Sequence, residues 1–303
     1  GKKLAFTVLN RLYVMDYPNG SAKRITSNDF TEAQPSWSND GNSIVFTTWN
    51  ADGGNLYKIN ADGSNQQKLT PVIGFYQSPV FNNEGDKIVF IRSKAQVYKN
   101  SIGPGYNGAE DELCWIASNG GNINFIEKSN GRGNPHFVKG INDRIYLNNG
   151  NGNLLSIKWD GTDEKIIAKV TGITTYGIST PKNNIKNGDN CMLNEKAAEE
   201  MEMNFPSSAD IITMSPTGTK ALAQINNEIY VMTIPQTGKI VNLSLADAGS
   251  AQFPARKLTE LGGEFPTWES NGKKVHWSLG ASHFVFDVDY ADFFDDSLKT
   301  AKK

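Results

Sequence analysis

A four-strand pattern that recurs along the chain is the feature that most limits what this sequence can fold into. Residues 34–70 hold four short strand-like runs separated by turn residues, in the order QPSW, SIVFTT, NLYKIN and QKLT. The same order without its first run precedes them, and the matching endings at Thr26 and Thr70 are 44 residues apart. Repetition at this interval is typical of a β-propeller, in which each repeat forms one four-stranded blade.

Further copies continue along the chain. They start at SPVF, NPHF, IITM and FPTW, and Trp37, Phe81, Phe137 and Trp268 supply bulk near the innermost runs. Each small sheet has two apolar faces, which neighbours arranged around an axis can bury. We therefore expect an all-β, six-bladed β-propeller, with seven blades as the alternative because the first unit lacks its innermost strand and the sixth its outermost. The expected blades lie near residues 1–30, 31–74, 75–130, 131–175, 207–260 and 261–290.

Two segments interrupt the repeat. The third unit carries a long loop from about Ser93 to Asn122, and residues 182–206 contain a run of helix formers, LNEKAAEEMEMN, which predicts a helical insertion. Residues 291–303 begin with acids and end with lysines, which predicts the start of a linker helix. The aspartates of this region lack the glycine turn and final glutamate of an EF-hand, so they do not predict a calcium site.

Composition argues against two classes of protein. The 30 basic and 32 acidic residues leave a net charge of -2, which provides no electrostatic attraction for nucleic acid. No apolar run approaches the roughly 18 residues that a membrane span needs. A strand-like run follows Gly1 almost at once, so we expect the chain to be a piece of a longer protein.

Motifs for catalysis and cofactor binding are missing from the sequence. The three histidines, His136, His276 and His283, form no His-x-His or His-Glu-x-x-His motif, so we expect no metal centre. There is no Gly-x-Ser-x-Gly elbow, and the GxGxxG string at residues 103–108 contains Pro104 and precedes no helical pattern. Cys114 and Cys191 form no Cys-x-x-Cys pair and are expected to be buried or idle thiols. We therefore expect no cofactor and no enzyme activity in this chain.

The blade motifs resemble those of a known family. The run PSWSNDG followed by IVFT and LY resembles the repeat of the TolB-like propellers, although Asn39-Asp40 and Asn83-Glu84 stand where the family usually has Pro-Asp. The runs GNPHF, LLSIKWDG, YVMTIPQTG and FPARKLT are similar to a subgroup that precedes a metal-dependent amidohydrolase domain in secreted bacterial proteins. The resemblance implies a periplasmic or secreted location, and it implies that the metal ligands belong to a C-terminal catalytic domain outside this chain.

These observations favour a non-catalytic module for protein or substrate interaction, or for control of substrate access. The alternatives are a stand-alone TolB-like propeller that binds a protein partner and, less favoured, an enzyme such as a lyase with its site in the channel. Binding is expected on the loops that lead into the innermost strands, because these loops surround one mouth of the channel. A turn or a hydrogen bond between blades is the alternative role for each residue of this group: Glu32, Gln34, Gln77, Arg132, Asn134, His136 and Glu264.

Overall fold

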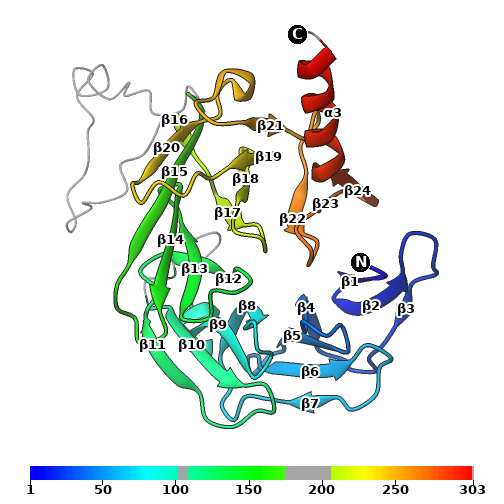
Figure 1. The fold of residues 1–303 in the computed structure, drawn as a ribbon. Helices are drawn as coiled ribbons and strands as arrows, with labels where there is room; N and C mark the ends of the chain where they lie inside the picture. Colours follow the sequence, from blue (N-terminus) through cyan, green and yellow to red (C-terminus); the bar gives the residue numbers. More distant parts are fainter. Residues whose placement is uncertain (102–107, 109, 175–205, 302–303) are drawn as a thin grey trace, which may run out of the picture.

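The computed structural model describes residues 1–101, 108, 110–174 and 206–301. Six small sheets stand around a ring, and the chain passes from each sheet to the next in order (Figure 1). The six-bladed β-propeller is thereby confirmed, and the described residues form no seventh blade. Blades 1 to 6 follow the order of the chain.

The first three blades follow the repeat closely. Blade 1 has three strands and blades 2 and 3 have four. Their strands are β1 (Lys3–Val8), β2 (Arg11–Asp16) and β3 (Lys23–Arg24); β4 (Thr31–Trp37), β5 (Ser43–Trp49), β6 (Leu56–Asn60) and β7 (Gln67–Lys68); and β8 (Phe75–Phe81), β9 (Lys87–Ser93), β10 (Glu112–Ala117) and β11 (Asn124–Lys128).

Blade 4 takes up two extra strands, whereas blade 6 has only three. The strands of blade 4 are β12 (Arg132–His136), β13 (Arg144–Asn149), β14 (Asn153–Lys158), β15 (Lys165–Thr174), β16 (Pro206–Ser208) and β20 (Val241–Ser244). Those of blades 5 and 6 are β17 (Ile211–Met214), β18 (Lys220–Ile225), β19 (Glu228–Thr233) and β21 (Ala255–Lys257); and β22 (Glu264–Trp268), β23 (Lys274–Leu279) and β24 (Ser282–Asp287).

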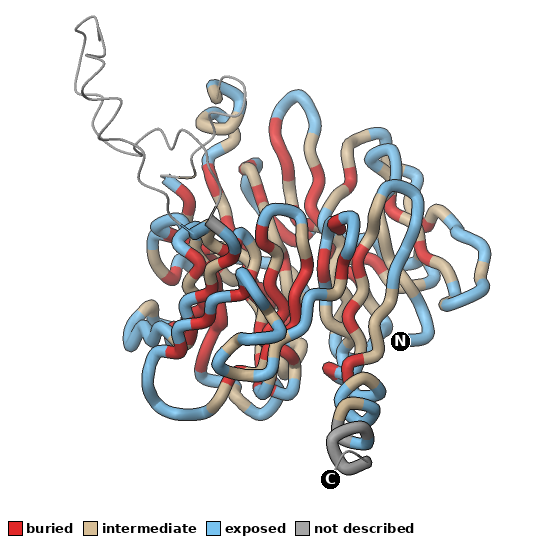
Figure 2. Tube along the Cα trace, turned by 90° about the horizontal axis from the view of Figure 1, so that it is seen from above, coloured by how far each residue is buried: buried red, intermediate tan, exposed pale blue. Residues whose placement is uncertain are grey.

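Antiparallel pairing gives the ring two distinct faces. Because strand directions alternate within a blade, the loops that enter the innermost strands lie at the same end as the hairpins between second and third strands. We call this end the mouth face. The opposite end, the base face, is where β24 stops and helix α3 (Val288–Ala301) begins. Figure 2 shows α3 projecting from one face of the ring, with buried residues along the strands.

Apolar side chains fill five of the six boundaries between blades. Between blades 2 and 3, for example, Val45 and Leu56 pack with Ile88 and Phe90, and all four are fully buried. Burying such a side chain contributes about 1.5–3 kcal/mol. The alternation of apolar residues in each repeat thus becomes a set of inter-blade cores.

The boundary between blades 6 and 1 is built differently. Among the described residues it holds no apolar cluster of this kind. Tyr17 instead packs edge-on against His276 and His283, with ring centroids 5.8 and 5.5 Å apart. The amino group of Gly1 also pairs with Glu269. Aromatic and polar contacts between the two three-stranded blades, 6 and 1, therefore close the ring.

The structure corrects several expectations about the interruptions. The segment 93–122, expected to be one loop, contains the short helix α1 (Ala95–Lys99) and the whole of β10, since the apolar run of β10 packs inside blade 3. Most of the helix expected at 182–206 lies outside the described residues, and Pro206 begins a strand. Helix α3 begins at Val288, before the expected residue 291. No helix in the described part of the chain has the length and apolarity required to cross a membrane.

Candidate binding face at the channel mouth

Two of the seven expected site residues begin an innermost strand at the mouth face. Arg132 is the first residue of β12, and Glu264 is the first residue of β22. Glu32 is the second and Gln34 the fourth residue of β4, and Gln77 is the third residue of β8. His136 is the last residue of β12, so it lies towards the base face instead.

Glu32 joins blades 1 and 2. Its carboxylate is fully buried and accepts hydrogen bonds from the backbone N–H of Leu12 at 2.7 Å, the hydroxyl of Thr26 at 2.8 Å and the amide of Asn28 at 2.8 Å. Three donors satisfy a buried carboxylate that would otherwise be costly to desolvate. This geometry supports a structural role for Glu32.

Arg132 is similarly occupied by neighbouring groups. Its guanidinium donates to the carbonyls of Ser129 and Lys128, both at 2.8 Å. It also forms ion pairs with Glu127 at 2.9 Å and Glu164 at 2.5 Å, and the side chain is only 7% exposed. These contacts use the cation within the protein, so Arg132 presents little charge to a ligand.

A backbone irregularity recurs in four innermost strands. The residue before a proline has a positive φ of 50–56° in each, and the pairing register shifts there. Such φ values are uncommon for residues with a side chain and cost about 1–3 kcal/mol. The four residues are Gln34, Ser78, Asn134 and Phe265.

These bulges redirect side chains between neighbouring blades. The Gln34 side-chain oxygen accepts a hydrogen bond from the backbone N–H of Ser78 at 2.7 Å, which links β4 to β8. Asn134 donates to the side-chain oxygen of Asn148 at 2.7 Å within blade 4. Phe265 is 77% exposed. The residue before proline thus has a different role from blade to blade. Gln34 and Asn134 form hydrogen bonds between strands, whereas Phe265 exposes an aromatic ring.

His136 connects blades 4 and 5. Its Nδ1 lies 2.8 Å from the Asn134 carbonyl oxygen, and its Nε2 accepts the backbone N–H of Met214 at 2.8 Å. Burial lowers the pKa of His136 to about 4. The neutral imidazole therefore fits this position, with the Nδ1 proton directed at the carbonyl.

The mouth face also carries apolar side chains that are not among the seven site residues predicted from the sequence. We call them the mouth rim, and they come from the β1–β2 hairpin and from the loops and strand starts that enter blades 3 and 6. Their exposed fractions range from 48% to 90%. The rim comprises Val8, Leu9, Val72, Ile73, Leu261 and Phe265.

Three half-buried aromatic residues lie beside this rim. Phe75 and Tyr98 stack with ring centroids 3.8 Å apart, and Trp49 meets both rings edge-on. They come from the mouth ends of β8 and β5 and from α1. A signal for this group was present in the sequence, because Trp49 and Phe75 each border a turn, but their convergence depends on the packing of blades 2 and 3.

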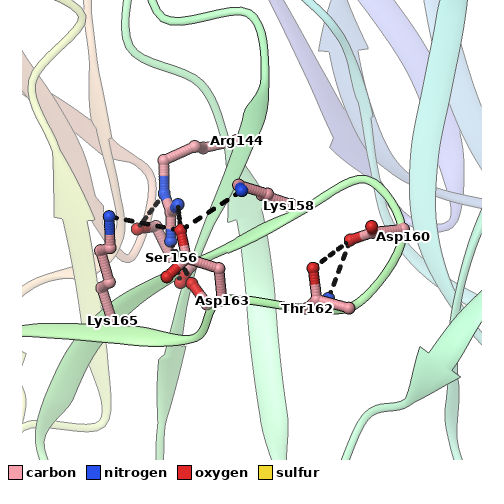
Figure 3. A network of polar contacts seen from close by, with 7 residues as sticks. All are labelled: Arg144, Ser156, Lys158, Asp160, Thr162, Asp163 and Lys165. Carbon is pink, nitrogen blue, oxygen red and sulfur yellow. Dashed lines mark hydrogen bonds and ion pairs between the residues drawn. The ribbon is translucent and has the colours of Figure 1, made fainter.

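Blade 4 holds a dense polar network (Figure 3). It joins the start of β13 to the β14–β15 turn, which places it at the base face. Arg144 bonds to Ser156 and to the Asp163 carboxylate at 2.8 Å, and Lys158 and Lys165 lie 3.7 and 3.3 Å from the same carboxylate. Hydrogen bonds from Arg144 and Lys165 hold the pKa of Asp163 below its usual value. Three cations share the Asp163 carboxylate, and all of these groups belong to blade 4, so the network holds the β14–β15 turn.

The structure also brings two histidines together that have separate positions in the sequence. The Nδ1 of His276 lies 3.2 Å from the Nε2 of His283, and the rings stack. Burial and the nearby positive charges lower the pKa of His276 to about 4. Within the described residues, no group of three or more His, Cys, Asp or Glu side chains is arranged to hold a metal ion.

Comparison with known proteins agrees with the fold. Residues 1–133 match the TolB beta propeller domain. The TolB-like character expected from the blade motifs is confirmed for these residues. The narrower link to amidohydrolase-associated propellers stays a prediction.

Solved structures extend the TolB-like fold over most of the chain. TolB from Acinetobacter baumannii has a TM-score of 0.60 at 12% identity, and the match covers 95% of this chain and 61% of that one. An oligogalacturonate lyase in complex with manganese has a TM-score of 0.56 at 13% identity, and the match covers 95% of this chain and 72% of that one. Hydrazine synthase from Kuenenia stuttgartiensis has a TM-score of 0.55 at 16% identity, and the match covers 91% of this chain and 39% of that one. This chain thus spans about three fifths of that TolB chain, and at these identities the likeness is one of fold.

Proposed function

We propose that this TolB-like propeller is a non-catalytic binding module that holds a protein or peptide partner on its mouth face. The observation that supports this most directly is the mouth rim, six apolar side chains between 48% and 90% exposed at the mouth ends of blades 1, 3 and 6. Exposed apolar residues grouped on one face are typical of protein interaction sites. The stacked Phe75 and Tyr98 add a rigid aromatic surface beside them.

The expected polar site residues then act mainly as supports. Glu32, Arg132 and Gln34 are each engaged with the protein itself, so they fix the positions of the innermost strands. Exposed Glu264 remains available at the mouth. In this proposal, the rim provides apolar contact area and the rigid bulges below it hold the entrance in one shape.

The resemblance to amidohydrolase-associated propellers makes the proposal more specific. We infer a periplasmic or secreted protein in which the propeller binds a partner or controls access to a separate catalytic domain. Helix α3 leaves the base face, so a domain joined through it would leave the mouth face accessible. The TolB-like partner-binding propeller remains the alternative within the same class.

The test compares two faces of the ring. Ile73→Asp and Phe265→Asp each place a charge in the rim, whereas Ile240→Asp places one outside it at nearly the same exposure, 53% against 54% for Ile73. The immobilised chain is offered a periplasmic extract of its source organism, and retained proteins are quantified by mass spectrometry. Retention of the same protein by wild type and by Ile240→Asp, with loss in both rim variants, is the expected result.

Equal retention by all variants would contradict the proposal.

A catalytic alternative is tested separately, because two oligogalacturonate lyases share the fold. Incubation of the purified chain with oligogalacturonate and Mn²⁺ is followed by ultraviolet absorbance of an unsaturated product. The binding-module proposal predicts no turnover, and sustained product formation would replace it with a lyase.

A further inference from the structure

One segment of blade 5 departs from the repeat. In blades 1, 2 and 3 a turn of a few residues joins the third strand to the outermost strand. In blade 5, residues 234–254 separate β19 from β21, and they cross to blade 4, where β20 pairs in parallel with β15. The register joins Ala168 to Val241 and Thr171 to Ser244. This excursion adds a wall beside the outer part of blade 5.

A cavity of about 510 Å³ lies between that wall and the blade. Its volume is in the range of small-molecule sites, roughly 300–1,000 Å³. Aliphatic side chains from both blades and from the excursion line much of it: Ile173, Ile225, Leu245, Ala248 and Ala255. The cavity thus offers an apolar compartment, and it is separate from the mouth rim.

Tyr230 supplies a hydrogen-bond donor to this compartment. The residue is only 8% exposed and lines the cavity, and none of the described residues forms a hydrogen bond with its hydroxyl. Burial raises the pKa of Tyr230, so the hydroxyl keeps its proton. Because none of the described residues uses this proton, the hydroxyl is a donor available to a ligand.

The acids around Tyr230 are already engaged. Glu228 accepts from the Thr259 hydroxyl and pairs with Lys257 at 3.0 Å. Asp247 accepts from Gly249 N and Ser250 Oγ in its own turn.

The cations keep some of their donor groups. Lys257 pairs with a single carboxylate and has further N–H groups, and Arg256 pairs with Asp295 through one nitrogen. Both cations line the cavity. The groups left for a ligand are therefore N–H and O–H donors beside aliphatic walls.

We infer that this cavity binds an amphiphilic carboxylate, whose apolar body lies against Leu245 and Ile225 and whose carboxylate accepts from Tyr230 and a neighbouring cation. A fatty acid and the C-terminal end of a peptide with an apolar last residue share this chemistry. Charge-assisted bonds to such donors favour a carboxylate over a neutral amide or alcohol of the same shape.

The chain contains a matched control for Tyr230. Tyr230 faces Lys257 across β19 and β21, and Tyr57 faces Lys68 in the same way across β6 and β7. Tyr57, however, packs against Phe30 and Phe46, with ring centroids 5.4 and 5.9 Å away, and it does not line the cavity beside blade 5. Tyr57→Phe therefore removes the same hydroxyl from the same kind of strand pair without touching the proposed site.

The experiment uses octanoate and N-acetyl-leucine as probes, with octanol and N-acetyl-leucinamide as their neutral counterparts. Calorimetric titration of the whole chain is expected to show binding of at least one carboxylate, and at least about tenfold weaker binding of its neutral counterpart. Tyr230→Phe is expected to weaken binding of the carboxylate by about tenfold, and Tyr57→Phe is expected to leave this binding unchanged. Binding of octanoate but not of N-acetyl-leucine indicates that the natural ligand is a lipid. Binding of N-acetyl-leucine but not of octanoate indicates a peptide C-terminus.

A second variant fills the cavity without altering its polar groups. Ala248→Leu places a larger side chain in the wall, and thermal unfolding verifies that the variant is folded. Loss of carboxylate binding in the folded variant supports the site. The inference is overturned if neither carboxylate binds wild type, if the neutral counterparts bind equally well, or if Tyr230→Phe and Tyr57→Phe behave alike.

Discussion

The Nε2 atom of His136 accepts a hydrogen bond from the backbone N–H of Met214 at 2.8 Å and thereby connects the innermost strands of blades 4 and 5. Neutral imidazole is needed for this contact, because a protonated Nε2 would face another donor. Burial accordingly lowers the pKa of His136 to about 4. The contact makes the joint between two blades dependent on pH.

Stability is expected to fall as the pH drops from about 6.5 towards 4. An unfolded histidine has a pKa of about 6.5, so across this interval the unfolded state binds more protons than the folded state. The contribution is fully present above the unfolded pKa and is lost on the way down to the folded pKa, up to about 3 kcal/mol. Urea unfolding at pH 7.5 and pH 4.5 measures it.

A substitution assigns this loss to His136. His136→Gln can still accept from Met214 but does not titrate, so the fall in unfolding free energy between the two pH values is expected to shrink. His276→Gln serves as the comparison, because the pKa of His276 is also lowered to about 4. An unchanged pH dependence in His136→Gln would show that the joint with Met214 is not the source.

Removal of the Glu32 carboxylate is expected to weaken the joint between blades 1 and 2. Glu32→Ala leaves the N–H of Leu12 and the hydroxyl of Thr26 without their acceptor, at a cost of about 2–4 kcal/mol. Exposed Glu260 provides the control substitution, Glu260→Ala. Chemical unfolding of both variants measures the difference, and equal stability would rule out the structural role of Glu32.

Gly263, in the loop before β22, is expected to tolerate no side chain. A Cβ atom there would lie 2.5 Å from Trp277 Cδ1 and 2.7 Å from Ile229 Cδ1, both in the core between blades 5 and 6. Gly263→Ala should therefore destabilise the protein by about 1–3 kcal/mol. Gly133→Ala, where a Cβ would meet nothing within 4 Å, is the control and should change the unfolding free energy little.

Cys114 is expected to be unreactive in the folded protein. It is fully buried, and burial raises the pKa of its thiol to about 12, so little thiolate is present at pH 8. In a Cys191→Ser variant, labelling by a disulfide reagent should follow global unfolding. Rapid stoichiometric labelling without denaturant would contradict the buried position.

The blade pattern was predictable because it is local. Strings such as QPSW, SPVF and FPTW mark the start of a unit, and each lies on an innermost strand of the structure, as do the first three residues of NPHF. The site was less predictable. Glu32 and Arg132 occupy the expected strands, but their bonding to Leu12, Glu127 and Glu164 depends on how neighbouring blades meet.

The sequence by itself determined the order of the blades and the positions of most turns, and it favoured six blades over seven, because strand alternation and turn chemistry act within a few residues. Tertiary structure decided which similar residues differ in role. Tyr13, Tyr57 and Tyr230 each face a cation across the same strand pair of their blades, but it is Tyr230 that lines a cavity walled by the excursion of blade 5. That difference comes from β20, which pairs with β15 of another blade, and a pairing between segments about 70 residues apart leaves no local signal in either.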